Sequence, residues 1–216
     1  MRHGATAGVT QDDTLRDAVA DYLVEHGIAD LTFRSLADAL DISTFKIVYH
    51  FGSKAQLIDT ALRRVSWREV AEVQSWMAQP AGPPPSVGEV LRRYWAWCLR
   101  PRRQAVMRLF IEAATLAMRD PESYPPVVRD ILQEGIDLER QIVVAAGSDA
   151  GESVAIATLV NGAVWGLQLD LIATGDAVRT TAAVHQLAAL VDDHLALSRA
   201  AAPTQTPASP PTEESA

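Results

Sequence analysis

Apolar residues recur at helical spacing along most of the chain, and the alternation typical of strands is nearly absent. In the first such segment, one apolar helix face is formed by Leu15, Ala18, Val19, Tyr22 and Leu23, which follow the i, i+3, i+4, i+7, i+8 pattern. The motif Thr10-x-x-Asp13 predicts the start of this helix, and Gly27 predicts a left-handed cap at its end. The pattern therefore predicts an all-α protein.

The same criteria predict eight further helices. Two short helices are expected at 32–40 and 44–50, separated by a tight turn at Asp41-Ile42. A capping box of Ser53 and Gln56 predicts a long helix from Lys54 to about residue 79. Beyond a proline-rich loop at 80–85, the remaining helices are expected at 86–99, 102–118, 126–146, 151–173 and 176–198.

The short helices before the long one have the layout of a helix-turn-helix domain, which presents its third helix to the major groove of DNA. Ile42, Ile47 and Phe51 are spaced to hold that helix against Leu36 and Leu40. The positions left facing outward are Ser43, Thr44, Lys46, Tyr49 and His50. The layout indicates a DNA-binding domain, although short helical hairpins also occur in proteins that never touch DNA.

The net charge of the chain argues against DNA binding. The 216 residues carry a formal net charge of -8, which by itself argues against a nucleic-acid partner. Residues 1–64 are also net negative, yet the stretch from Ile42 to Gln56 contains two lysines and no acid. One of them, Lys54, lies at a helix N-terminus, where backbone N–H groups and a cation together favour a phosphate. We therefore expect a weak, local positive surface and a shallow dependence of DNA binding on salt.

Composition excludes several other classes of protein. A 48% apolar chain of this length can form one large domain or two small ones, and the single cysteine, Cys98, allows neither an internal disulfide nor a thiolate-rich metal site. The N-terminal residues lack the apolar core of a signal peptide, and the longest apolar stretch is interrupted by polar residues. A soluble cytoplasmic protein with no membrane partner is expected.

The segment Thr32-Phe-Arg-Ser-Leu-Ala-Asp-Ala-Leu-Asp-Ile-Ser43, followed by Ile47-Val-Tyr-His-Phe-Gly-Ser-Lys54, resembles the signature of the tetracycline-repressor (TetR) family. That signature reads Thr-x-Arg-x-Leu-Ala-x-x-Leu-Gly-Val-Ser, then Leu-Tyr-x-His-Phe-x-Ser-Lys. The close match covers residues 10–62. Two positions depart from it: Asp41 replaces the usual glycine of the turn, and Val48 replaces a tyrosine that commonly contacts phosphate.

The resemblance implies a dimeric, ligand-responsive regulator, most often a repressor, that binds a palindromic operator with its recognition helices about 34–36 Å apart. The domains expected are a flexible N-terminus at 1–9, a helix-turn-helix domain at 10–55, a helical effector-binding and dimerisation domain at 56–199, and a disordered tail at 200–216. The DNA-binding residues expected are Arg34, Ser43, Thr44, Phe45, Lys46, Tyr49, His50 and Lys54. Phe45 stands where a small residue is usual, and it either packs on a thymine methyl group or covers the local core.

A small-molecule effector is also implied, because the family binds ligands between its later helices. One polar stripe draws attention on the helix from 151: Thr158, Asn161, Trp165 and Gln168 share a face of a very apolar segment. A buried amide needs a partner, which could be a ligand, a neighbouring helix or a second subunit. The candidate ligand-binding residues are Trp97, Phe110, Asn161, Trp165 and Gln168. The effector's identity is left open by the sequence.

The dimer implied by the resemblance would form through the last two helices. On the last helix an apolar stripe consists of Val184, Leu187, Ala188, Val191 and Leu195, which we expect at the dimer interface. Gly162 and Gly166 would let another helix approach closely, either from a partner subunit or within the protomer.

A run of arginines without an intervening acid comprises Arg92, Arg93, Arg100, Arg102, Arg103 and Arg108. It could attract an anionic ligand, but a solvated face is favoured because Arg108 and Glu112 lie at i, i+4. No metal-ligand spacing, glycine-rich phosphate loop, nucleophile motif or carboxylate pair is found, so neither a metal, a cofactor nor an enzyme is expected. The rival function is a TetR-like helical ligand-binding or interaction protein without specific DNA binding.

Overall fold

The computed structural model describes residues 11–77, 85–121 and 127–201, and within these ranges it contains nine helices and no strand. The helices are α1 (Gln11–His26), α2 (Phe33–Leu40), α3 (Thr44–Phe51), α4 (Lys54–Met77), α5 (Val87–Cys98), α6 (Pro101–Arg119), α7 (Val127–Ala145), α8 (Ala150–Thr174) and α9 (Ala177–Ala201). The predicted all-α class is confirmed. The segment 1–9, the Thr10 cap, loop residues 80–84 and the tail from 202 lie outside the described residues, and α9 continues two residues past the predicted boundary at 199.

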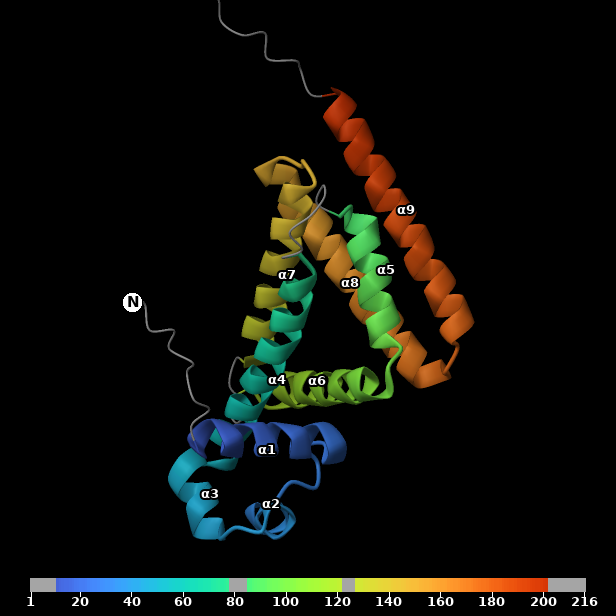
Figure 1. The fold of residues 1–216 in the computed structure, drawn as a ribbon. Coiled ribbons are helices and arrows are strands. Elements are labelled where there is room, and N and C mark those ends of the chain that lie inside the picture. Colours follow the sequence, from blue (N-terminus) through green and yellow to red (C-terminus); the bar gives the residue numbers. More distant parts are fainter. Residues whose placement is uncertain (1–10, 78–84, 122–126, 202–216) are drawn as a thin grey trace, which may run out of the picture.

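The helices form two groups (Figure 1). Helices α1, α2 and α3 make up one end of the molecule, and α6 lies across it next to α1. Helices α4, α5, α7, α8 and α9 extend away from that end, with α4 leading out of the first group into the second. Because α4 packs on α1 at one end and on α7 further along, it connects the two groups directly.

Side-chain caps account for the sharp helix boundaries at the N-terminal end. Thr32 and Ser35 form a reciprocal capping box at the start of α2, and the Ser43 hydroxyl accepts a hydrogen bond from Lys46 N at the start of α3. The predicted box of Ser53 and Gln56 is present before α4. Asp41 adopts the left-handed conformation, with φ 52°, that the family's glycine would supply. The turn geometry therefore survives this departure from the family pattern.

Two large hydrophobic cores and a smaller cluster of Trp95, Cys98, Leu171 and Val184 hold the molecule together. The N-terminal core joins α1–α3 to the first half of α4, to α6 and to the start of α7, and includes the fully buried Leu23, Leu36, Ile47 and Leu57. The C-terminal core joins α5, the end of α7, α8 and α9. The N-terminal core therefore extends well beyond the three helices of the helix-turn-helix.

Helix α8 is very apolar: by length and composition alone, its segment Gly151–Thr174, with a mean hydropathy of 1.4 in its most apolar window, could cross a membrane. Core helices of water-soluble proteins have the same composition. In the structure α8 packs against α7 and α9, and its Ile156, Val160 and Val164 belong to the C-terminal core. Its apolar character is accounted for in part by this packing.

Candidate DNA-binding surface and internal cavity

Helix α3 is attached to the domain by one face and leaves the other open. Ile47 and Phe51 are buried in the N-terminal core, as predicted. Phe45 and Tyr49 are 78% and 76% exposed, and their ring centroids lie 6.4 Å apart on the outer face. The alternative in which Phe45 covers the local core is therefore wrong, because its ring is in solvent and available to a groove.

The other predicted DNA-binding residues lie on or beside this face. Ser43 and Thr44 are exposed at the start of α3, and Lys46 is half-buried along it. Lys54 is exposed at the first position of α4, and Arg34 is exposed in the first turn of α2. Arg34 therefore precedes α3 in the sequence and Lys54 follows it. Each lies near a helix N-terminus, where backbone N–H groups also favour anions.

His50 differs from these residues because it has a partner inside the protein. Its Nδ1 lies 3.1 Å from Oδ1 of Asp12 on α1, and its side chain is only 25% exposed. This places a carboxylate beside the recognition helix even though the sequence from 42 to 56 contains no acid. The local surface is thus less positive than the sequence indicates.

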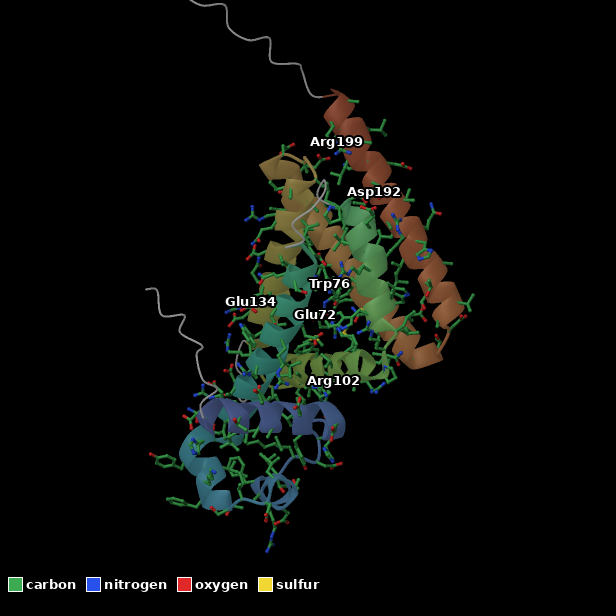
Figure 2. All side chains as sticks on the ribbon, in the orientation of Figure 1. Glu72, Trp76, Arg102, Glu134, Asp192 and Arg199 are labelled. Carbon is green, nitrogen blue, oxygen red and sulfur yellow. The ribbon has the colours of Figure 1, made fainter. Side chains whose placement is uncertain are left out.

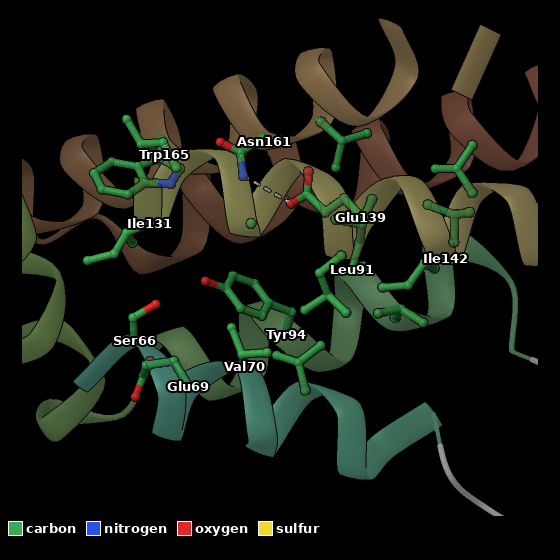
Figure 3. A pocket seen from close by; sticks show the side chains of 18 of the residues that line it. Ser66, Glu69, Val70, Leu91, Tyr94, Ile131, Glu139, Ile142, Asn161 and Trp165 are labelled. Carbon is green, nitrogen blue, oxygen red and sulfur yellow. Dashed lines mark hydrogen bonds between the residues drawn. The ribbon is translucent and has the colours of Figure 1, made fainter. Parts of the chain in front are cut away.

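A cavity of about 120 Å³ lies between the two cores. Its walls come from α4 (Ser66, Glu69, Val70, Val73), α5 (Val87, Val90, Leu91, Tyr94), α6 (Arg103), α7 (Ile131, Leu132, Gly135, Leu138, Glu139, Ile142, Val143) and α8 (Val160, Asn161, Trp165). Figure 3 shows this mainly apolar chamber with a few polar groups pointing into it. Such a chamber is typical of small-molecule sites.

Two of the five candidate ligand-binding residues, Asn161 and Trp165, line the cavity, and three do not. Trp97 packs edge-on against Tyr94 and Trp76. Phe110 is buried in the N-terminal core. These two positions therefore support the fold and do not line the cavity.

Gln168 is the third candidate that does not line the cavity. It belongs to the polar stripe of α8, whose four residues have different environments in the structure. Gln168 is 3% exposed but absent from the cavity wall. Thr158 is exposed, and its hydroxyl donates to the carbonyl of Val154 in its own helix at 2.8 Å. Of these four residues, only Asn161 and Trp165 line the cavity.

Arg103 corrects the interpretation of the arginine run. Its side chain is only 7% exposed, its Nε lies 2.7 Å from Oε2 of Glu69, and its Nη2 donates to the Tyr94 hydroxyl at 2.7 Å. Burial raises the pKa of Glu69, and the positive charge of Arg103 opposes that rise. A solvated face is therefore wrong for Arg103, and its charge is already neutralised by a carboxylate at the wall of the cavity.

Glu139 was not predicted as a site residue, and it is the more unusual of the two carboxyl groups. Its Oε1 accepts a long, 3.5 Å contact from Asn161 Nδ2, and its Oε2 is buried with no hydrogen-bond partner among the described residues. Burial raises the pKa of Glu139 to about 8. A signal existed in the sequence, because Glu139 shares the apolar face of α7 with Gly135 and Ile142 at steps of four and three.

A cluster of ion pairs connects α1 to α4 and α6. Asp17 binds Arg64 and Arg68, while Asp21 binds Arg68 at 2.8 Å and Arg102 at 2.6 Å. Figure 2 shows Arg102 on α6 at its junction with α1. These pairs lower the pKa of Asp17, chiefly through its hydrogen bond to Arg64.

Glu112 of α6 strengthens the same junction. Its two carboxylate oxygens accept hydrogen bonds from the backbone N–H groups of Ile28 and Ala29, at 2.9 and 2.7 Å. The expected i, i+4 pair of Arg108 and Glu112 is therefore wrong, because Glu112 turns toward the loop between α1 and α2. The interdomain contact takes precedence over the intrahelical pair because it satisfies two backbone donors at once.

The predicted dimer stripe on α9 lies inside the protomer. Val184, Ala188 and Leu195 are at most 2% exposed and pack in the cores formed with α5. The assignment of this stripe to a dimer interface is wrong. Exposed apolar side chains lie elsewhere on the last two helices, at Val154, Leu159, Leu169, Val178, Leu190 and Leu197.

The two glycines of α8 lie in this exposed region. A Cβ atom added at Gly162 or Gly166 would meet no atom within 4 Å among the described residues. Packing of another helix of the same protomer against these glycines is therefore excluded for the described part of the chain. An approach by another molecule remains open.

Known proteins share both the N-terminal motif and the fold of this chain. Residues 15–61 match the family model described as bacterial regulatory proteins, tetR family. A TetR transcriptional regulator from Legionella pneumophila is 19% identical, with a TM-score of 0.66 over 90% of this chain and 99% of that chain. A transcriptional regulator from Rhodococcus sp. Rha1 is also 19% identical, with a TM-score of 0.66 over 88% and 97%.

A third structure with this fold is that of the multidrug binding protein EbrR complexed with imidazole. It is 23% identical and has a TM-score of 0.58 over 82% of this chain and 94% of that chain. The sequence has no match among curated proteins. Residues 15–61 therefore match the N-terminal domain of the tetR family of bacterial regulatory proteins, and the chain has the fold of solved TetR-family transcriptional regulators.

Proposed function

We propose that this protein is a ligand-responsive repressor that binds a palindromic operator as a homodimer and releases it when a small molecule occupies the cavity. Regulators of this family are non-enzymatic, typically cytoplasmic proteins that bind DNA and small-molecule effectors and act as dimers. One observation supports the coupling of the two activities most strongly. The cavity is lined by Ser66 and Glu69 of α4, and the same turns of α4 hold α1 through Arg64 and Arg68.

DNA recognition is assigned to the exposed face of α3 and its flanks. Lys54 and Arg34 are proposed to bind phosphates, since each is an exposed cation near a helix N-terminus. Thr44 and Lys46 are proposed to contact base edges, with Ser43, Tyr49 and His50 beside them. The exposed Phe45 ring suits the methyl group of a thymine.

Dimerisation is assigned to the outer face of α8 and α9. Leu159 and Leu190 are 72% and 58% exposed there, and Gly162 and Gly166 leave room for a close helix approach. Exposed leucines and glycines on one pair of helices are a feature that a symmetric partner surface would bury. The two recognition helices of such a dimer would read half-sites about one helical turn apart.

Release of DNA is proposed to act through α4 and α6. A ligand that displaces Glu69 or Arg103 moves the two helices that this ion pair joins. Both helices are bound to α1 by the ion pairs of Asp17 and Asp21, and α6 also holds the loop after α1 through Glu112. The distance between the α3 helices of the two subunits would then change. It would no longer match the fixed spacing of the two half-sites in the operator.

The rival is a ligand-binding protein of this fold without specific DNA binding. It is supported by Val48 in place of the phosphate-contacting tyrosine, by the net negative charge of residues 1–64, and by the carboxylate of Asp12 beside His50. A gel-shift assay with the DNA that flanks the protein's own gene separates the two. Specific binding that competitor DNA of unrelated sequence does not remove supports the proposal. Binding that is equally weak to all sequences, at low salt as well, favours the rival.

A further inference from the structure

The carboxyl group of Glu139 is incompletely satisfied in an otherwise apolar chamber. One oxygen has only the long contact from Asn161, and the other is buried without a hydrogen-bond partner among the described residues. Figure 3 shows Glu139, Asn161 and Tyr94 around the same space. A buried polar atom without a partner is costly, and a ligand that supplied the missing charge or donor would remove that cost.

The charges around the cavity favour a cation over an anion. Its lining residues include one guanidinium, Arg103, and that group is bound to Glu69 at 2.7 Å. Glu139 is then the only carboxyl group among the lining residues that has no cationic partner, and these residues contain no lysine. The Nη1 of Arg103 is also buried without a hydrogen-bond partner among the described residues, but the charge of this guanidinium is already balanced by Glu69. An anionic ligand would add a second negative charge beside that one cation, whereas a cationic ligand would bring the positive charge that Glu139 lacks.

The remaining walls suit the body of such a ligand. Tyr94 and Trp165 contribute aromatic rings, and the aliphatic wall includes Leu91 and Ile142. Aromatic faces attract organic cations, and the attraction is stronger where water is excluded. An ammonium group beside Glu139 would therefore be held by the carboxylate, with its hydrocarbon part against the aromatic and aliphatic walls.

We propose that the effector of this protein is a small lipophilic monocation, an amine or quaternary ammonium compound, whose positive centre binds the Glu139 carboxylate. This inference rests on the proposed function, because it names the ligand class of the same cavity. It assigns to Glu139 the role of counter-ion, and to Asn161 the role of a positioning residue that holds the other carboxylate oxygen.

Binding of a cation is coupled to proton release. Burial raises the pKa of Glu139 to about 8, so in the empty cavity at neutral pH the carboxyl group is largely protonated. The arriving cation favours the carboxylate, and the proton leaves to solvent, so one positive charge replaces another. The other titratable groups at the cavity are Glu69 and Arg103, which pair with each other, and Tyr94, which accepts a hydrogen bond from Arg103.

The test uses the full-length protein and two probes of nearly equal shape. Benzyltrimethylammonium is a permanent cation that does not titrate, and neopentylbenzene is its neutral carbon isostere. Their affinities are measured by calorimetry and thermal shift for the wild type, for Glu139→Gln, and for the matched control Glu134→Gln. Glu134 is an exposed glutamate on the same helix, so the control removes the same charge outside the cavity.

At about pH 8 the wild type and Glu134→Gln should bind the cation at least about tenfold more tightly than the isostere, a difference of about 1.4 kcal/mol. Glu139→Gln should lose this preference. In the wild type, affinity for the cation should rise about tenfold between about pH 6 and pH 7 and level off above the pKa of Glu139, while Glu139→Gln shows no such rise. The wild-type pH profile tests the proposal even where a variant fails to fold.

Three results would overturn the proposal: equal or tighter binding of the isostere, no binding of either probe at millimolar concentration, or an unchanged cation affinity in folded Glu139→Gln. Operator binding is measured on the same samples without a probe. Specific DNA binding together with a preference for the isostere refutes the cation alone. Absence of specific DNA binding refutes the proposed repressor, whatever the probes do.

Discussion

Arg103 and Glu69 join α6 to α4 at the wall of the cavity, with Nε of the arginine 2.7 Å from Oε2 of the glutamate. The guanidinium also lies 4.9 Å from the centroid of the Trp97 ring and donates to the Tyr94 hydroxyl. One side chain therefore connects α4, α5 and α6. In the proposed release of DNA, a ligand in the cavity would act on α4 and α6 through this pair.

Breaking this pair should be far more costly than removing it. Arg103→Leu leaves the Glu69 carboxyl buried without its partner, and we expect a loss of about 3–5 kcal/mol in the free energy of unfolding. The double variant Arg103→Leu with Glu69→Leu should recover most of that loss, since apolar residues can replace a buried pair. Urea unfolding of both variants measures the difference, and equal losses would contradict a coupled pair.

Glu139 should make the protein less stable as pH rises. Its folded-state pKa, about 8, is above the ordinary value of 4.5, so the stability it contributes is present below about pH 4.5 and is lost as pH rises through about 8. The expected slope between these values is about 1.4 kcal/mol per pH unit for one proton. Glu139→Gln should remove that part of the slope, and unfolding titrations from acid to neutral pH should show Glu134→Gln unchanged.

Lys54 and Lys46 should have separable effects on DNA binding. Lys54→Ala removes a proposed phosphate contact, so affinity should fall by a similar factor for every sequence, with a salt slope smaller by about one. Lys46→Ala removes a proposed base contact and should relax specificity by about 1–3 kcal/mol at one base pair. Binding to a set of single-base operator variants distinguishes the two, and a Lys54 effect confined to one position would contradict its phosphate role.

The exposed face of α8 can be tested without disturbing the protomer. Gly162→Phe meets open space within the described protomer, and replacing a helical glycine favours the helix. We expect the variant to keep its helix content and to dissociate at concentrations where the wild type is dimeric, as measured by sedimentation velocity. Gln133→Phe, on the exposed side of α7, is the matched control. A dimer as stable as the wild type would place the interface elsewhere.

Local signals predicted the helices well, because caps and turns are properties of neighbouring residues. Ser53 with Gln56 fixed the start of α4, and Asp41 adopts the left-handed turn expected of it. Periodicity could not predict which partner an apolar face meets. The stripe of Val184 and Ala188 is the same pattern whether it packs on α5 or on a second subunit.

The polar residues of the cavity were harder to predict for a related reason. The pairing of Arg103 with Glu69 depends on the crossing of α4 and α6, which local sequence does not encode. The sequence places Glu139 on the apolar face of α7, but it does not show that α4, α5 and α8 form a cavity around that face. The contact of Glu112 with the backbone at Ile28 spans 84 residues and replaces the local pair that spacing favoured.

The position of the cavity between the two hydrophobic cores has a mechanical consequence. Ile131 and Trp165 on its wall pack with the N-terminal core, whereas Val90, Ile142 and Val160 belong to the C-terminal core. A ligand in this cavity would touch both cores at once, and in the proposed release of DNA it would push them apart. The unit that would move in this proposed mechanism is larger than the helix-turn-helix, because α1–α3 share one core with α6, the first half of α4 and the start of α7.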